Sequence, residues 1–281
     1  MFTLNCKGKI LSLEKPLVMG IINATPDSFY EGHLAKGMDE ILKLAEKMIR
    51  EGAAILDIGG QSSRPGSERI TEQEELERVI PVIQLIRQHF SDVILSIDTY
   101  YSIVAENAVK QGVSIVNDIS AGEMDKAMIP MVASLKVPYI CMHMKGTPGT
   151  MQKNISYGDV VKEVLDFFIQ KTAACSAAGI NDIIIDPGFG FGKTNEHNLK
   201  LLKELKLFSM LDKPILVGLS RKSTVYKTLN ITAAEALNGT TVLNTLALQN
   251  GASILRVHDV KEAKEAVDLM DAYKCAGMKM C

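Results

Sequence analysis

The sequence has no tryptophan, few aromatic residues and no excess of basic residues. Its 31 lysines and arginines stand against 33 aspartates and glutamates, which gives a net charge of −2. A protein that binds nucleic acid broadly needs a basic surface to neutralise phosphates, so this balance argues against such a partner. There is no uncharged apolar run of roughly 18 residues, and the N-terminus lacks the apolar core of a signal peptide. We therefore expect neither a nucleic-acid partner nor a membrane association.

The five cysteines form no pattern typical of a disulfide framework or a zinc site. Their number is odd, their spacing is irregular, and no C-x-x-C pair occurs, which favours a reduced, cytoplasmic chain. The five histidines are isolated, without a His-x-His pair, so a histidine-bound metal is not expected. Asn23 and Asp57 could still supply oxygen ligands to Mg²⁺, which needs few protein ligands when a substrate phosphate is present.

Short apolar runs alternate with longer stretches of helical periodicity along the whole chain. The runs are apolar throughout, as in strands that are buried on both faces of a parallel sheet. The eight predicted strands are Leu17–Ile22, Ala54–Ile58, Val93–Ile97, Val113–Val116, Tyr139–Met142, Ile183–Ile185, Ile215–Gly218 and Ser253–Val257. Four glycines, at 52, 112, 179 and 251, each follow a helical stretch, in the position of a left-handed helix C-cap.

Helices are predicted between these strands, and one of them opens with Thr71 and Glu74 at the spacing of a capping box. The predicted helices are Met38–Glu51, Thr71–Phe90, Tyr101–Gln111, Ala127–Leu135, Tyr157–Ala178, Glu196–Lys206, Ala233–Asn250 and Val260–Ala276. Eight strand–helix units predict a (β/α)8 TIM barrel in one domain, residues 1–281. A doubly wound open sheet is the alternative that periodicity leaves open. Residues 1–16 are expected to form a short hairpin, turning at Lys7 and Gly8, that closes the barrel floor.

Polar residues follow the apolar runs. In a barrel the carboxyl ends of all strands meet at one rim, where enzymes of this fold keep their active sites. The residues at these positions are Asn23, Asp57, Asp98, Asn117, Asp118, His143, Asp186, Ser220, Lys222, Arg256 and His258. The connections at this end are also long and rich in glycine and proline, notably residues 23–32, 59–66 and 145–150. Together these features predict a ligand site at the rim, covered by loops.

Two motifs leave alternatives open. The glycine-rich stretch Gly188–Thr194 is not a P-loop, because Pro187 stands where the first glycine would fall, and its glycines instead favour close approach of backbone to a flat ligand. Lys222 is either a Schiff-base lysine, as in aldolases, or a positively charged hydrogen-bond donor. In the second case it joins Arg256 and His258 as a group of cations where barrels often bind phosphate.

The motifs resemble, in order along essentially the whole chain, those of the dihydropteroate synthase family. They are Met19–Phe29, Asp57–Gly60, Arg64–Gly66, Ser96–Thr99, Val116–Asp118, Met142–Met144, Asp186–Lys193, Gly218–Ser223 and Arg256–Asp259. The resemblance implies a barrel transferase of the folate pathway. Such an enzyme joins 7,8-dihydropterin-6-ylmethyl diphosphate to 4-aminobenzoate and releases pyrophosphate and 7,8-dihydropteroate. The resemblance also implies a homodimer, and a site at which sulfonamides mimic the aminobenzoate.

The resemblance assigns roles to individual residues. Asn23 contacts Mg²⁺, the implied cofactor, and Asp98, Lys222, Arg256 and His258 are the catalytic residues. The implied substrate-binding residues are Ser63, Asp98, Asn117, Met142, Asp186, Phe191, Gly218, Lys222, Arg256 and His258. The aminobenzoate pocket is implied to involve Thr25, Phe29, Arg64, Pro65 and Ser220. The chain departs from the family at Gln61, where a glutamate is usual.

The chemistry of these residue types agrees with the implied reaction. Carboxylates accept hydrogen bonds from the amino and ring N–H groups of a pterin, while Mg²⁺ and basic groups stabilise a leaving pyrophosphate. Asp98 and Asp186 could help to hold the pterin cation left behind, and an arylamine nucleophile requires no dedicated general base. A corrinoid methyltransferase and a non-catalytic pterin-binding barrel are the alternatives, but neither needs Arg256, His258 or the Ser63–Gly66 loop.

Overall fold

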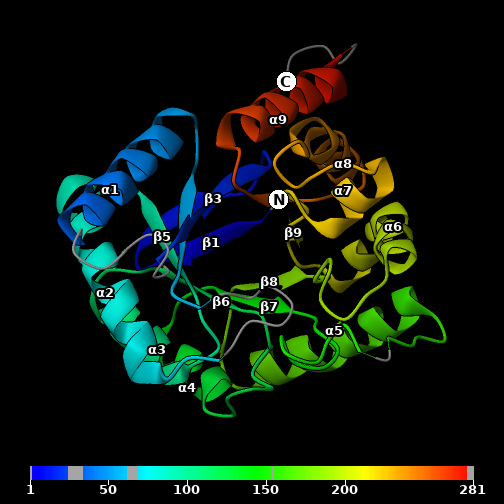
Figure 1. The fold of residues 1–281 in the computed structure, drawn as a ribbon. Helices are drawn as coiled ribbons and strands as arrows, with labels where there is room; N and C mark the ends of the chain where they lie inside the picture. Colours follow the sequence, from blue (N-terminus) through cyan, green and yellow to red (C-terminus); the bar gives the residue numbers. More distant parts are fainter. Residues whose placement is uncertain (1, 25–33, 62–68, 154, 277–281) are drawn as a thin grey trace.

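The computed structural model describes residues 2–24, 34–61, 69–153 and 155–276 (Figure 1). Eight parallel strands lie in the order β8-β7-β6-β5-β4-β3-β10-β9. They are β3 (Leu17–Asn23), β4 (Ile55–Gly59), β5 (Ile94–Asp98), β6 (Ile115–Asp118), β7 (Tyr139–Met142), β8 (Ile183–Asp186), β9 (Leu216–Val217) and β10 (Ile254–Val257). A parallel bridge between Ile185 and Ile215 joins β8 to the start of β9 and closes the ring. The predicted TIM barrel is therefore confirmed, and the alternative of an open sheet is wrong.

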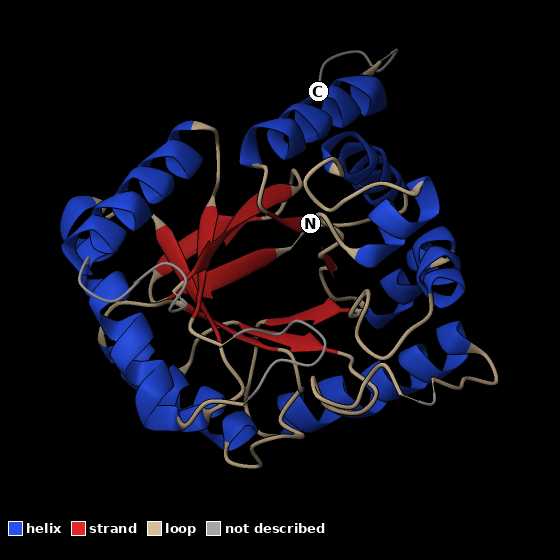
Figure 2. Ribbon diagram, in the orientation of Figure 1, coloured by secondary structure: helices blue, strands red, loops and turns tan. Residues whose placement is uncertain are grey.

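Helices surround the barrel on its outer side (Figure 2). They are α1 (Leu34–Arg50), α2 (Glu72–His89), α3 (Ser102–Lys110), α4 (Met128–Leu135), α5 (Val160–Ala177), α6 (Asn195–Lys203), the 3-10 helix η2 (Leu205–Leu211), α7 (Ser223–Leu229), α8 (Leu237–Gln249) and α9 (Val260–Cys275). None of the helices in the described ranges is long and apolar enough to cross a membrane.

Several helix ends lie where local sequence signals predict them. Thr71 and Glu74 form the predicted capping box, with the Glu74 N–H donating to Thr71 Oγ1 at 3.2 Å and the Thr71 N–H donating to Glu74 Oε2 at 2.7 Å. The four predicted cap glycines all have positive φ, between 96° and 104°. The short helix α7 was not predicted, because its seven residues are too few to show a helical period.

Alternate residues of each barrel strand face the interior. One interior residue from every strand belongs to a single apolar cluster. These residues are Met19, Ile55, Ile94, Ile115, Ile140, Ile184, Leu216 and Ile254. The neighbouring strand residues, such as Leu56 and Val116, belong instead to the larger cluster beneath the helices. Both faces of the strands are thus buried, as the uniformly apolar runs predicted.

A two-stranded hairpin packs on this interior cluster. It consists of β1 (Thr3–Cys6) and β2 (Lys9–Ser12), joined by Lys7 and Gly8 with φ of 55° and 92°. Two successive positive φ values define the type I′ turn that suits a two-residue hairpin. Leu4, Cys6 and Leu13 share the cluster with the interior residues of the eight strands. The hairpin therefore covers the end of the barrel opposite the candidate site.

Candidate active site

The polar residues of the interior begin two residues beyond the apolar cluster. Because alternate strand residues share a face, Ile55 is followed by Asp57, Ile115 by Asn117, Ile184 by Asp186 and Ile254 by Arg256. In the same way Asp98 lies four residues after Ile94 and Asn23 lies four residues after Met19. The strand period thus keeps these side chains, called the interior layer below, on the interior face, about 7 to 13 Å along the strands from the apolar cluster.

Arg256 on β10 connects two carboxylates across the barrel interior. Its Nε donates to Asp57 Oδ2 and its Nη2 donates to Asp98 Oδ2, each at 2.6 Å. Asn117 Nδ2 donates to the same Asp57 oxygen at 2.9 Å. Asp57 is completely buried, and its other oxygen, Oδ1, has no hydrogen-bond partner within the described chain. Asp57, expected from the sequence as a rim residue and an oxygen ligand to Mg²⁺, lies at the centre of this network.

The electrostatics of the network follow from burial and pairing. Burial raises the pKa of Asp98 to about 7, while the Arg256 guanidinium acts in the opposite direction. Burial also raises the pKa of Asp186, against the influence of Lys222. The nearby carboxylates raise the pKa of Arg256 although its burial opposes this. The site therefore contains a permanent cation and carboxyl groups whose ionisation is sensitive to what binds beside them.

Lys222 lies immediately before α7 and points into the same layer. Its Nζ donates to the Phe189 carbonyl at 2.7 Å and lies 4.7 Å from the centroid of the Phe191 ring. Burial lowers the pKa of Lys222 to about 8, and Asp186 opposes this effect. Gly218 leaves room here, because a Cβ at this position would contact Lys222 Nζ at 3.8 Å and Arg256 Cβ at 3.9 Å.

His258 differs from its predicted state. Burial, followed by the neighbouring Arg256, lowers the pKa of His258 to about 4, so the imidazole is neutral near pH 7. Its Nδ1 lies 3.0 Å from Ser220 Oγ, which also accepts from the His258 backbone N–H at 3.2 Å. Where the hydroxyl donates its proton to Nδ1, the neutral imidazole carries its own proton on Nε2. The sequence grouped His258 with the cations, whereas in this structure burial and the fixed positive charge of Arg256 disfavour the imidazolium.

Asp118 and His143 belong to the framework rather than to the interior layer. Asp118 accepts from the Tyr139 hydroxyl and from Ser120 and Gly122 at 2.7 Å each, which holds the turn after β6. Burial, together with the charge of Lys193, lowers the pKa of His143 to about 2, and its Nδ1 lies 2.9 Å from Lys193 Nζ. Lys193 is a buried residue that the sequence analysis did not assign to the site.

Other predicted site residues are also close to this layer. Met142, at the end of β7, pairs in register with Asp186, and Phe191 is largely buried beside Lys222. Asn23 is the exposed last residue of β3. Gln61, the departure from the family, accepts through Oε1 from the Ile70 N–H and the Tyr100 hydroxyl. The predicted residues Thr25, Phe29, Ser63, Arg64 and Pro65 lie outside the described residues.

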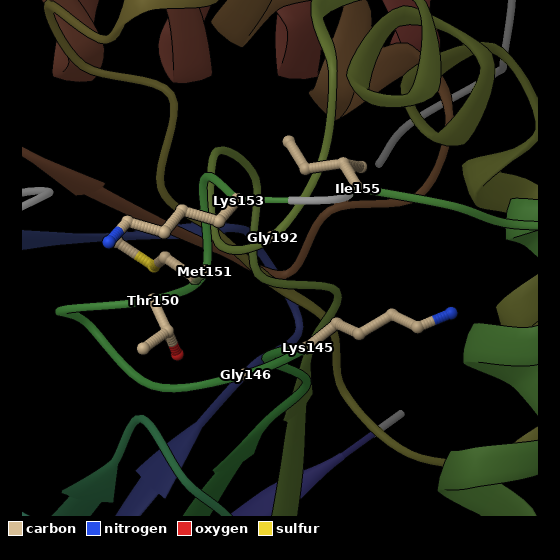
Figure 3. Close-up of a pocket in the computed structure, with 7 residues that line it drawn as sticks. All are labelled: Lys145, Gly146, Thr150, Met151, Lys153, Ile155 and Gly192. Atoms are coloured by element: carbon tan, nitrogen blue, oxygen red, sulfur yellow. The ribbon is translucent and has the colours of Figure 1, made fainter.

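A separate pocket of about 370 Å³ lies beside the loop after β7. Figure 3 shows its lining residues, which are Lys145, Gly146, Thr150, Met151, Lys153, Ile155 and Gly192. Lys145 points away from the others and its Nζ contacts Glu163 and the Ser156 carbonyl. None of the charged interior residues lines this pocket, so we place the candidate active site at the interior layer instead.

The comparisons with known proteins agree with this geometry. The model of the pterin binding enzyme family matches residues 19–258, which places the chain in the class of barrel enzymes that bind pterins. A dihydropteroate synthase of Escherichia coli strain K12 is 42% identical over 268 residues, which covers 95% of this chain and 94% of the relative. The chain therefore belongs to the dihydropteroate synthase family of pterin binding enzymes, as the sequence motifs predicted.

Solved structures support the same family assignment. The dihydropteroate synthase of Yersinia pestis in a sulfonamide drug complex has a TM-score of 0.91 at 40% identity, covering 98% of this chain and 100% of that one. The dihydropteroate synthase of Xanthomonas albilineans with 4-aminobenzoic acid has a TM-score of 0.89 at 39% identity, covering 97% of this chain and 98% of that one. Another structure of the Xanthomonas enzyme contains 7,8-dihydropteroate. The predicted class of enzyme, a transferase, is confirmed.

Proposed function

We propose that this chain condenses 7,8-dihydropterin-6-ylmethyl diphosphate with 4-aminobenzoate, giving 7,8-dihydropteroate and pyrophosphate in folate biosynthesis. The observation that carries the proposal is the interior layer in which Arg256 joins Asp57 to Asp98, with Asp186 and Lys222 beside them. This layer combines acceptors for a pterin with cations for a diphosphate, as the reaction requires. The solved relatives with 4-aminobenzoic acid and 7,8-dihydropteroate support small-molecule substrates of these two kinds.

The pterin is assigned to the carboxylate side of the layer. Asp98, Asn117 and Asp186 supply acceptors, and an amide also donates, so that they match the alternating donors and acceptors of the pterin edge. Met142 offers an apolar surface for the flat ring. Lys222 donates from the opposite side, and Gly218 and Phe191 complete the proposed pocket next to it.

The diphosphate is assigned to Arg256, to the Nε2–H of His258 and to the hydroxyl of Ser63. Mg²⁺ fits beside them, because Asp57 Oδ1 is a buried carboxylate oxygen without a partner in the described chain and Asn23 is an exposed amide residue at the end of β3. The described residues contain no group of three or more acidic, histidine or cysteine ligands, so most of the ligands would come from diphosphate and water. When bound, the ion would neutralise charge on the leaving pyrophosphate.

The chain's own residues then account for the remaining chemistry. Arg256 and His258 hold the diphosphate while the carbon–oxygen bond breaks, and the carboxylates of Asp98 and Asp186, in their ionised form, stabilise the delocalised pterin cation. The arylamine attacks without a dedicated base. Its proposed pocket consists of Phe191, Ser220 and Lys222, with Thr25, Phe29, Arg64 and Pro65 contributed by the first two loops. The residues assigned to the pterin, to the diphosphate and to the arylamine together form the catalytic and binding site that we propose.

We further propose that the chain acts as one cytoplasmic domain that pairs into a homodimer through α8 and α9. Large apolar residues are exposed on these helices. Val242 on α8 is 51% exposed, and on α9 Leu269 is 72% and Tyr273 is 69% exposed. These residues, together with a groove between the two helices, form an apolar face that pairing would cover. Sedimentation of wild type and Leu269→Glu tests this, because a charge on the face should convert the dimer to a monomer. A wild-type monomer would contradict the dimer.

A pyrophosphate-release assay tests the reaction. Release should require both the pterin diphosphate and 4-aminobenzoate, whereas a non-catalytic pterin-binding barrel would bind pterin and release nothing. A corrinoid methyltransferase would instead consume methyltetrahydrofolate. Borohydride in the presence of a carbonyl compound should trap no adduct on Lys222, since we propose it as a hydrogen-bonding cation. A reduced adduct found by mass spectrometry would move the protein to the aldolase class.

A further inference from the structure

Lys193 ends the glycine-rich loop after β8, and the proposed reaction gives it no role. Its side chain is buried, with 3% of the residue exposed. Nζ donates to the carbonyls of Gly188 at 2.9 Å, Phe191 at 3.0 Å and His143 at 3.2 Å, and it lies 2.9 Å from His143 Nδ1. Burial lowers the pKa of Lys193 well below its usual value, and these four contacts engage its N–H groups whether the nitrogen carries two hydrogens or three. The group is therefore fully engaged by the protein itself.

The acceptors belong to two segments whose backbones touch. Gly188 has a φ of 69°, and a Cβ there would lie 2.0 Å from the His143 carbonyl oxygen. Gly192 has a φ of 67°, and a Cβ there would lie 2.3 Å from the Lys145 carbonyl oxygen (Figure 3). Only glycine permits both the conformation and the contact. At this junction the amino group of Lys193 donates to the buried carbonyls of His143, Gly188 and Phe191, of which the Gly188 carbonyl also accepts from the Phe191 N–H at 3.1 Å.

The same loop supports groups of the proposed site. The Gly188 N–H donates to Asp186 Oδ1 at 2.8 Å. The Phe189 carbonyl accepts from Lys222 Nζ at 2.7 Å, and the ring of Phe191 lies under that ammonium. A shift of this backbone would therefore move Lys222 and the Phe191 ring together.

We infer that Lys193 is a positioning residue for aminobenzoate binding, because it fixes the 188–191 backbone in the form that places Lys222 and Phe191. The inference rests on the proposed roles of those two residues. Without this amino group, three buried carbonyls lose a hydrogen-bond donor. The loop then moves toward water, which replaces the lost hydrogen bonds. Lys193 itself lies behind the loop and touches no substrate.

Lys193→Met tests the inference, since methionine has a similar length and no donor. We expect the KM for aminobenzoate to rise on the order of tenfold or more, with a smaller change in kcat. Lys200→Met is the matched control, because this exposed lysine on α6 pairs with Asp159 at the surface. Lys193→Arg restores donors to the junction and should bring the KM back toward the wild-type value. A folded Lys193→Met enzyme with a wild-type KM would overturn the inference.

A measurement on the wild-type protein covers the case in which Lys193→Met does not fold. In protein with ¹⁵N-labelled lysine, the buried Nζ of Lys193 should give a signal distinct from those of the exposed lysines, assigned by its absence in Lys193→Arg. The signal should shift when aminobenzoate, pyrophosphate and Mg²⁺ are added together, and an unchanged signal would overturn the inference.

Failure of the inference and failure of the proposed function give different results. If wild-type protein releases no pyrophosphate, the proposed function is wrong. If the wild type turns over and Lys222→Met raises the KM while Lys193→Met does not, only the inference is wrong.

Discussion

The two ends of the barrel interior differ in composition although the same strands build both. At the floor, eight aliphatic side chains and the hairpin form a purely apolar cluster. At the rim, Asp57, Asp98, Asp186 and Arg256 occupy the same interior face only a few residues further along. The floor is held by apolar contacts that any well-fitting side chain can make. At the rim, charged side chains are buried together with specific partners, as Arg256 is with Asp57 and Asp98. Within one strand, the residues near the floor therefore contribute mainly to stability and those near the rim mainly to function.

Replacement of Arg256 should have the largest effect, because it lowers both the stability of the protein and its turnover. Arg256→Met leaves the carboxylates of Asp57 and Asp98 buried without a cation, which costs about 3–5 kcal/mol of the free energy of unfolding. Pyrophosphate release should fall on the order of 10²- to 10³-fold in the folded fraction, because a donor to the leaving group is lost. Denaturant unfolding and the release assay measure both effects. Arg256→Lys keeps the charge but cannot span both carboxylates, so near-normal turnover in this variant would contradict the bridging role.

A cavity at the floor should reduce stability and leave the chemistry unchanged. Leu4 is buried beneath the strands, and Leu4→Ala should lower the free energy of unfolding by about 2–5 kcal/mol. Turnover by the folded protein should stay at the wild-type level. Ile10→Ala is the control on the same hairpin, since Ile10 is 64% exposed and its truncation should be nearly silent. A fall in kcat for Leu4→Ala would show that the two ends are coupled.

A change at Asp186 should reduce ligand binding and leave stability nearly unchanged, the reverse of the result expected for Leu4→Ala. Asp186→Asn keeps an oxygen for the Gly188 N–H but turns the other oxygen into a donor that faces a ligand donor. Pterin affinity should fall by about 1–3 kcal/mol with little loss of stability. Calorimetry with a pterin analogue measures the affinity. Unchanged binding in a folded variant would remove Asp186 from the pterin site.

Glu75 provides a third point of comparison, because it is a buried carboxyl group near the rim. It is fully buried on α2, close to Gly60, and neither carboxyl oxygen has a hydrogen-bond partner in the described ranges. Burial raises its pKa from 4.5 to about 8. The unfolded chain loses this proton above about pH 4.5 whereas the folded chain keeps it, so stability falls as the pH rises toward 8.

Glu75→Gln should remove this pH dependence. Its free energy of unfolding relative to wild type should increase between pH 5 and pH 8, by up to about 1.4 kcal/mol per pH unit. Denaturant unfolding at several pH values measures the difference. Glu77→Gln, at an exposed position on the same helix, should follow the wild type. Parallel pH curves for Glu75→Gln and wild type would show that Glu75 is ionised in the folded state.

Much of the fold could be read from short-range patterns. The apolar runs, the capping box at Thr71 and the cap glycines are local features, and the structure confirms them. The helices after Lys203 were less predictable. The predicted helix Glu196–Lys206 ends at Lys203 and gives way to the 3-10 helix η2, and the predicted helix Ala233–Asn250 begins only at Leu237. Tertiary packing decides such ends, because helix propensity differs little among these residues.

The sequence by itself determined the barrel and the set of residue types at its rim, because the period of a strand and the position of a residue in a motif are properties of the chain alone. Only the tertiary structure decided which of these residues meet. Asp57 became the partner of Arg256 from 199 residues away, His258 became neutral, and Lys193 became the donor for three carbonyls. Hydrogen bonding, ionisation and burial depend on neighbours in space, and barrel closure brings those neighbours together.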